Sequence, residues 1–275
     1  MRQRARNLRL IGWTLLLEAW RRREVYAIVL VTTALLIGLR FVRFFEMEGL
    51  GKFYREISLK VMNVTTAATV ILLAARQLPR EFSDRTIYPL LAKPVSRLEF
   101  LLGKFLGVMG AGVFCYALFM AVFLVGSVTL EAPMNMALFA QSVYLQVLSL
   151  GVLASLVFLL SMLLNADAAV TIAAILYLTS QVFMTLMSYL YDYVSRTGRW
   201  ALLAMHFIVP QLTLFDPSAK TVHSVSRTVV GDAIEQTVVW RALPAGTLLQ
   251  LTVYAAAYAI LYLGAAHLLF RRKPL

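Results

Sequence analysis

Four long stretches of this chain contain no Asp, Glu, Lys or Arg, and they restrict its fold more than any other feature. A helix of about 20 apolar residues is needed to cross about 30 Å of hydrocarbon, and each stretch is long enough. Only 15% of the residues are charged, which is low for a water-soluble domain. The chain is therefore predicted to be an all-α polytopic membrane protein. The four stretches are 105–130, 132–166, 168–191 and 242–270.

Six transmembrane helices are predicted when the shorter apolar runs are added. The first two spans are weaker, because their charge-free cores cover only residues 25–39 and 61–75. They require Arg40, Arg43 and Lys60 to extend their charged groups to the interface. We treat residues 1–275 as a single transmembrane domain. The predicted spans are 25–45, 57–78, 98–128, 139–164, 167–191 and 246–270.

The distribution of Lys and Arg predicts the orientation. Most of the 26 basic residues lie before the first span, between the second and third spans, and after the last span. Short cytoplasmic loops carry such an excess, so both termini are predicted to be cytoplasmic in a multi-pass protein of the bacterial inner membrane. The net charge of +12 is expected to meet anionic lipid headgroups rather than nucleic acid.

The first 24 residues are predicted to form a cytoplasmic interfacial helix. Arginines alternate there with apolar residues, and residues 6–24 carry the amphipathic pattern. A basic tail that only fixes the topology is the alternative.

The interval between the second and third spans is long and patterned. Connections between neighbouring helices usually take about 2–8 residues, whereas residues 79–97 separate these two spans. Pro79 is favourable in the first turn of a helix, and Glu81 and Asp84 would then lie near its positively polarised end. Pro94 is expected to end this helix. The interval predicts a short cytoplasmic helix along the membrane plane, with a packed loop as the alternative. Its apolar residues are Phe82, Ile87, Leu90 and Leu91.

At this interval the chain resembles the permease subunits of ABC-2 type transporters, six-span exporters that a separate ATPase drives. The resemblance rests on an acidic residue followed by Thr and two Leu, a Pro-Val-Ser-Arg turn, and Leu-Gly-Lys at the start of the third span. Arg85 stands where the family has glycine, which disfavours a positive φ there. The chain resembles in particular the permease that serves maturation of nitrous oxide reductase. The matching residues are Glu81, Thr86, Leu90, Leu91, Pro94, Val95, Ser96, Arg97, Leu102, Gly103 and Lys104.

The resemblance implies that two permease copies, expected to be a homodimer, assemble with two ABC ATPase subunits. Each ATPase would bind the coupling helix in the interval 79–97. The chain has no Gly-x-x-x-x-Gly-Lys-Ser/Thr loop, so ATP and Mg²⁺ are expected on the partner. This chain is expected to be no enzyme and to bind no cofactor or metal. The residues implied for ATPase coupling are Glu81, Phe82, Asp84, Thr86, Leu90, Leu91, Pro94, Ser96 and Arg97.

Uncharged polar residues within the spans predict either a substrate path or hydrogen bonds between helices, and the two readings are equally favoured. At the turn between the fourth and fifth spans, Asp167 is predicted to cap the fifth helix, with a second ATPase contact as the alternative. The candidate path-lining residues are Thr65, Thr66, Thr69, Gln146, Thr179 and Gln181.

The external loop 192–245 is predicted to form a re-entrant or cap region. Residues 200–215 are too apolar for a solvated linker, and Pro210 interrupts them. Residues 216–241 are polar and β-branched and predict a small folded cap. The loop would gate release or only pack on the bundle. A metal site at His206 and His223 is disfavoured, because no Cys joins them and no compact ligand spacing is present.

The favoured function is the permease subunit of an ATP-driven exporter. The alternative is an ABC-type membrane component that acts mechanically on a periplasmic protein or assists metalloenzyme maturation, with a periplasmic accessory protein as partner. A stand-alone channel or carrier is disfavoured, because the third to sixth spans lack the ionisable residues that ion coupling needs.

Overall fold

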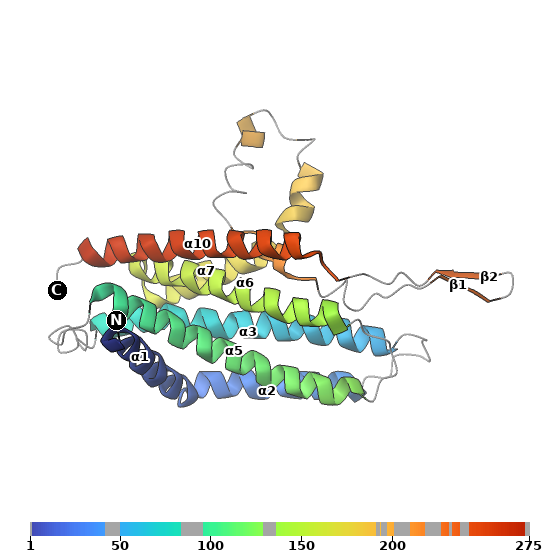
Figure 1. The fold of residues 1–275 in the computed structure, drawn as a ribbon, viewed down its shortest axis with the longest axis horizontal. Coiled ribbons are helices and arrows are strands. Elements are labelled where there is room, and N and C mark those ends of the chain that lie inside the picture. Colours follow the sequence, from blue (N-terminus) through green and yellow to red (C-terminus); the bar gives the residue numbers. More distant parts are fainter. Residues whose placement is uncertain are drawn as a thin grey trace.

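The structure, a computed structural model, describes residues 2–41, 50–83, 96–128, 136–190, 193, 197–200, 210–217, 227–230, 233–236 and 242–272. Figure 1 shows an elongated bundle whose long helices run along its long axis. The helices are α1 (Arg2–Trp20), α2 (Arg23–Phe41), α3 (Leu50–Ser83), α5 (Arg97–Val128), α6 (Met136–Leu163), α7 (Ala166–Leu190), the 3-10 helix η1 (Leu212–Phe215) and α10 (Ala245–Arg272). Two short strands are β1 (Arg227–Val230) and β2 (Ala233–Gln236).

Four helices of the described part are long and apolar enough to cross a membrane. They correspond to the second, third, fourth and sixth predicted spans. Helices α2 and α7 occupy the positions of the first and fifth, and the described apolar part of α7 is shorter, Ala166–Gln181. The multi-pass architecture is confirmed, and the count of six remains a prediction. The four candidate spans are Glu56–Phe82, Arg97–Ser127, Met136–Leu163 and Ala245–Arg272.

The core lies where α3, α5 and α6 meet. Small side chains allow close approach of the helices, since Ala67 and Ala74 of α3 and Ala154 of α6 are fully buried. Gly112 of α5 lies directly against Val70 of α3, because a Cβ at Gly112 would be 2.5 Å from Cγ2 of the valine. Packing of this kind is the main source of helix association within a bilayer.

The predicted start of a separate helix at Pro79 is wrong. Helix α3 continues through Pro79 to Ser83. A proline inside a helix removes one hydrogen bond and costs about 3 kcal/mol, so other contacts have to hold this turn. Leu78 is fully buried, and Glu81 forms an ion pair with α5. Glu81 therefore lies at the negatively polarised C-terminal end of α3, not at the positive end of a new helix.

Helix α1 packs along the first part of α5, which the sequence pattern did not reveal. A Cβ at Gly107 would lie 2.8 Å from Cβ of Leu15 and 2.9 Å from the carbonyl oxygen of Gly12. A Cβ at Gly103 would lie 2.9 Å from Cβ of Ile11. Gly103 and Gly107 are four residues apart, the spacing that brings two helix backbones together. The other face of α1 is exposed, with Trp13 59% accessible, so its predicted interfacial position stays open for test.

The chain turns twice at the same end of the bundle. Helix α1 ends at Trp20, earlier than the predicted limit at residue 24, and α2 begins at Arg23. Between α6 and α7, the N–H of Ala169 donates to the carbonyl of Asn165 over 2.9 Å. Asn165 is therefore the N-cap, and the predicted cap at Asp167 is wrong by two positions. Asp167 lies in the first turn of α7, where its negative charge interacts favourably with the positive end of the helix dipole.

At the opposite end, the segment after Pro210 returns to the bundle. Phe215 of η1 is buried, and the N–H of Gln211 donates to the Tyr254 hydroxyl over 3.1 Å. Asp216 accepts from Lys60 Nζ at 3.2 Å and from Asn63 Nδ2 at 3.4 Å. Strands β1 and β2 pair antiparallel, from Arg227 opposite Gln236 to Val230 opposite Ala233. This hairpin lies beyond the bundle and is the one departure from an all-helical fold in the described residues.

Candidate coupling site

The predicted coupling interval begins and ends in contacts that the structure describes. Its start, at Glu81, binds Lys104 of α5 with an Oε1 to Nζ distance of 2.6 Å. Gln77 Oε1 accepts a second hydrogen bond from Lys104 at 3.2 Å, and the ammonium lies 5.8 Å from the Phe100 ring centre. The lysine is only 6% exposed, so these acceptors replace the water that burial removes. The pair locks the end of α3 to α5.

The end of the interval forms a capping box at the start of α5. The Ser96 hydroxyl accepts from the N–H of Glu99 at 3.2 Å, and the Glu99 carboxylate accepts from the N–H of Ser96 at 3.2 Å. This reciprocal pair satisfies two backbone donors that the first helical turn leaves without partners. Ser96 therefore fixes where α5 begins.

Arg97 connects α5 to the end of α10. Its Nη1 donates to the carbonyl of Phe270 at 2.8 Å and to the carbonyl of Arg271 at 3.0 Å. The guanidinium lies 5.6 Å from the centre of the Phe270 ring. A cation at the C-terminus of a helix donates hydrogen bonds to the free carbonyls and interacts favourably with the negative end of the helix dipole.

Phe82 completes the contact between α3 and α10. Its ring meets Phe270 edge-on with centroids 5.8 Å apart, and Phe100 of α5 lies 6.1 Å from the same ring. The three rings join one helix end each from α3, α5 and α10. We call the seven residues Gln77, Glu81, Phe82, Ser96, Arg97, Lys104 and Phe270 the junction.

The other predicted coupling residues lie outside the described residues. They are Asp84, Thr86, Leu90, Leu91 and Pro94. Their contact with a partner therefore stays a prediction.

Within the part of the chain that the structure describes, neither the pocket beside Arg76 nor the pocket beside Cys115 is lined by a candidate path residue. The hydroxyls of Thr66 and Thr69 donate to carbonyls one turn earlier in α3, at 2.7 Å and 2.9 Å, and both side chains are fully buried. Thr65 donates in the same way to Val61 at 2.7 Å. Gln146 is buried in α6. Thr179 and Gln181 are half-buried in α7. For the three threonines, hydrogen bonding within the helix accounts for the polar side chain without any ligand.

Sequence reasoning left several of these contacts unassigned. The sequence Ser96-Arg-Leu-Glu99 is a capping-box pattern and could have been recognised. The pair of glycines at 103 and 107 is likewise a known close-packing pattern. Gln77 carries no comparable pattern, because its role depends on the position of Lys104.

The described residues contain no group of three or more His, Cys, Asp or Glu side chains that could hold a metal ion. His206 and His223 lie outside the described residues. Cys115, the only cysteine of the sequence, is buried in α5.

Several apolar helices whose ends are joined at the junction define a multi-pass membrane protein. The family model described as ABC-2 family transporter protein matches residues 2–275, so the chain belongs to this family. It is a permease subunit of an ABC transporter, and the family associates with an ABC ATPase that hydrolyses the ATP. The match identifies no subgroup, so the likeness to the nitrous-oxide-reductase permease stays a prediction. No curated protein matches the chain at a significant level.

Proposed function

We propose that this chain is the membrane half of an ATP-driven exporter in which two permease copies work with two ATPase subunits. ATP would close the ATPase dimer, and the interval 79–97 would carry that movement to the permease. The helices would then shift as rigid bodies and change access to a central path. Both termini and the interval would lie in the cytoplasm.

The observation that supports coupling is the junction. The interval starts at the end of α3 and finishes at the start of α5, and both ends are tied by charge-assisted hydrogen bonds. Glu81 links α3 to α5, and Arg97 links α5 to α10. A force applied between residues 82 and 96 would therefore act on three helices at once instead of bending a loose connection.

Orientation has a separate support. Arg76 and Arg80 at the end of α3, Arg97 at the start of α5 and Arg271 at the end of α10 are at one end of the bundle. An excess of arginine at one membrane face is typical of the cytoplasmic side.

The experiment separates ATPase contact from internal packing. In the variant Leu90→Asn with Leu91→Asn, we expect the permease to insert normally but to lose most of the copurified ATPase. The control replaces Leu124 and Val125, an adjacent exposed pair near the opposite end of the bundle in α5, by Asn in the same way. The amount of ATPase recovered with each variant and its transport-linked ATP turnover are measured. Normal recovery and turnover with the 90–91 variant would mean that the interval is only a connector.

The purified chain alone should hydrolyse no ATP. This follows from the missing phosphate-binding loop. Sustained hydrolysis by a verified single-chain sample would contradict the assignment as a permease.

A further inference from the structure

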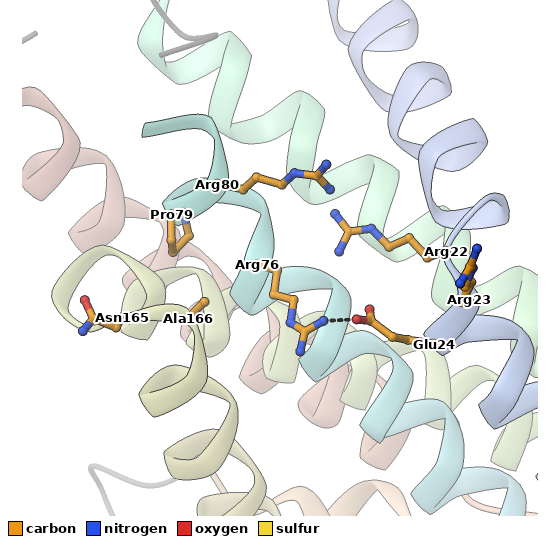
Figure 2. Close-up of a pocket in the computed structure, with 8 residues that line it drawn as sticks. All are labelled: Arg22, Arg23, Glu24, Arg76, Pro79, Arg80, Asn165 and Ala166. Carbon is orange, nitrogen blue, oxygen red and sulfur yellow. Dashed lines mark hydrogen bonds and ion pairs between the residues drawn. The ribbon is translucent and has the colours of Figure 1, made fainter. Parts of the chain in front are cut away.

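An open pocket of about 680 Å³ lies at the arginine-rich end of the bundle. It is enclosed by the corner between α1 and α2, the last turns of α3, and the turn between α6 and α7. Figure 2 shows that Arg22 and Arg80 extend into it from opposite sides, while Asn165 and Ala166 form its far edge. The lining residues are Arg22, Arg23, Glu24, Arg76, Pro79, Arg80, Asn165 and Ala166.

Arginines dominate the lining of the pocket. Four of them line it, and among the described residues two carboxylates bind them. Glu24 forms an ion pair with Arg76. Glu18 of α1 binds Arg22 at 2.6 Å and Arg80 at 3.3 Å. Arg23 pairs with neither carboxylate, so its charge can attract an anion that enters the pocket.

Some of the arginine donors have no acceptor. Nε of Arg22 is buried and makes no hydrogen bond. Since the Arg22 side chain is only 11% exposed, water does not readily replace the missing acceptor. Arg23 forms no hydrogen bond or ion pair with any described residue. A buried N–H without an acceptor is unfavourable, and a ligand oxygen would remove that cost. Each guanidinium group can donate two parallel hydrogen bonds to two oxygens of one phosphate group. Several guanidinium groups around one space are therefore suited to binding a phosphate.

The pocket lies at the depth of the lipid headgroups. Glu24 is in the first turn of α2, and Arg76 follows the long apolar run of α3. Asn165 connects two apolar helices, α6 and α7. Each of these positions marks a change from hydrocarbon to water, and lipid phosphates are found at that level.

The pocket is distinct from the junction. Arg76 and Arg80 are four residues apart and share one face of α3, whereas Gln77 and Glu81 face α5. The pocket and the junction therefore use different faces of α3. We propose that the pocket binds the phosphate group of an anionic phospholipid in the adjacent leaflet. The lipid would connect the corner of α1 and α2 to α3 and α7 through one shared anion.

The test titrates the purified full-length chain in detergent with phosphatidylglycerol or with phosphatidylcholine of the same acyl chains, and counts bound lipids by native mass spectrometry. The pocket variant combines Arg23→Gln with Arg80→Gln. The control combines Arg9→Gln with Arg272→Gln, which removes the same charge from exposed arginines outside the pocket. Inorganic phosphate is added in a separate series to distinguish a lipid headgroup from a free anion.

We expect the wild-type chain and the control to prefer phosphatidylglycerol and the pocket variant to lose that preference, with about twenty-five-fold weaker binding at about fivefold for each of its two arginines. The single variant Arg23→Gln should show the smaller loss, and it breaks no contact within the described residues. Equal losses in the pocket variant and the control would overturn the proposal, because they would show a general charge effect. Full displacement of the lipid by millimolar inorganic phosphate would overturn the lipid as the source. An unchanged preference for phosphatidylglycerol in the pocket variant would also overturn the proposal.

Discussion

At the scale of single residues, Lys104 is the most deeply buried charged residue of the described structure. An ammonium with 6% exposure needs close acceptors, and Glu81 and Gln77 provide them at 2.6 Å and 3.2 Å. Removing one partner of a buried pair leaves an uncompensated charge, whereas replacing both is often nearly neutral. The two single changes and the double change should therefore not add.

Replacing Lys104 by Met should destabilise the chain by about 3 kcal/mol, because it removes the ammonium that binds the Glu81 carboxylate at 2.6 Å. The double variant Lys104→Met with Glu81→Gln should recover most of that loss. Thermal unfolding in detergent measures both of these and the single variant Glu81→Gln, and Arg272→Met at an exposed helix end is the control. If the double variant is as unstable as the sum of the singles, the ion pair does not couple the two residues.

Ser96 offers a second test at this scale. The change to Ala removes the oxygen that accepts from the N–H of Glu99, and the loss of an N-cap costs about 1 kcal/mol. Ser96→Thr keeps the hydroxyl and should stay close to wild type. Melting temperatures of the two variants give the comparison. Should Ala and Thr have the same small effect, the capping box is not a source of stability.

At the scale of elements, glycine spacing decides how α1 is held. Gly103 and Gly107 bring α5 against Ile11, Gly12 and Leu15, so that α1 is part of the bundle as well as a candidate for the interface. In the interior of a helix, alanine is normally more stable than glycine. The opposite result is expected only where a neighbouring backbone occupies the position of the methyl group.

Gly107→Ala should therefore destabilise the chain, since its Cβ would lie 2.9 Å from a backbone oxygen of Gly12. Gly264→Ala in α10 is the matched control, because no atom lies within 4 Å of the added methyl group there. The control should be neutral or more stable by about 0.5–1 kcal/mol. Melting temperatures and the rate of trypsin cleavage in α1 report both effects. The same sign for both substitutions would mean that α1 does not pack closely on α5.

The positions of the long helices could be predicted from the sequence, because an apolar run longer than about 20 residues has few alternatives. Local chemistry was less informative at Pro79. Its preference for a first helical turn is a local property, but burial of Leu78 and the Glu81 ion pair keep α3 continuous. The junction depends on partners distant in sequence, such as Arg97 and Phe270, and a single sequence does not reveal such pairs. The capping box was the exception, since it is local and readable.

At the scale of the whole molecule, the charge distribution and the bundle give the same division into two ends. The junction and the arginine pocket lie at one end, while the Lys60 and Asp216 pair and the β1 and β2 hairpin lie at the other. This polarity predicts which residues are accessible from each side of the membrane. The crossing of α7 is the critical step, because it decides whether the chain has the fifth of the six predicted spans.

Labelling of single cysteines tests both the orientation and that crossing. The background is Cys115→Ala, which removes the only cysteine, and the sites are Asn165 before α7, Tyr193 after it, and Arg272 at the end of α10. All three are exposed. A membrane-impermeant maleimide should label Tyr193→Cys in intact cells, because the external loop follows α7. It should label Asn165→Cys and Arg272→Cys only after the membrane is permeabilised, because the arginine-rich end is expected in the cytoplasm. The reverse pattern would invert the orientation and leave the bundle intact. Labelling of Asn165→Cys and Tyr193→Cys from the same side would mean that α7 does not cross, and the six-span arrangement would then be wrong.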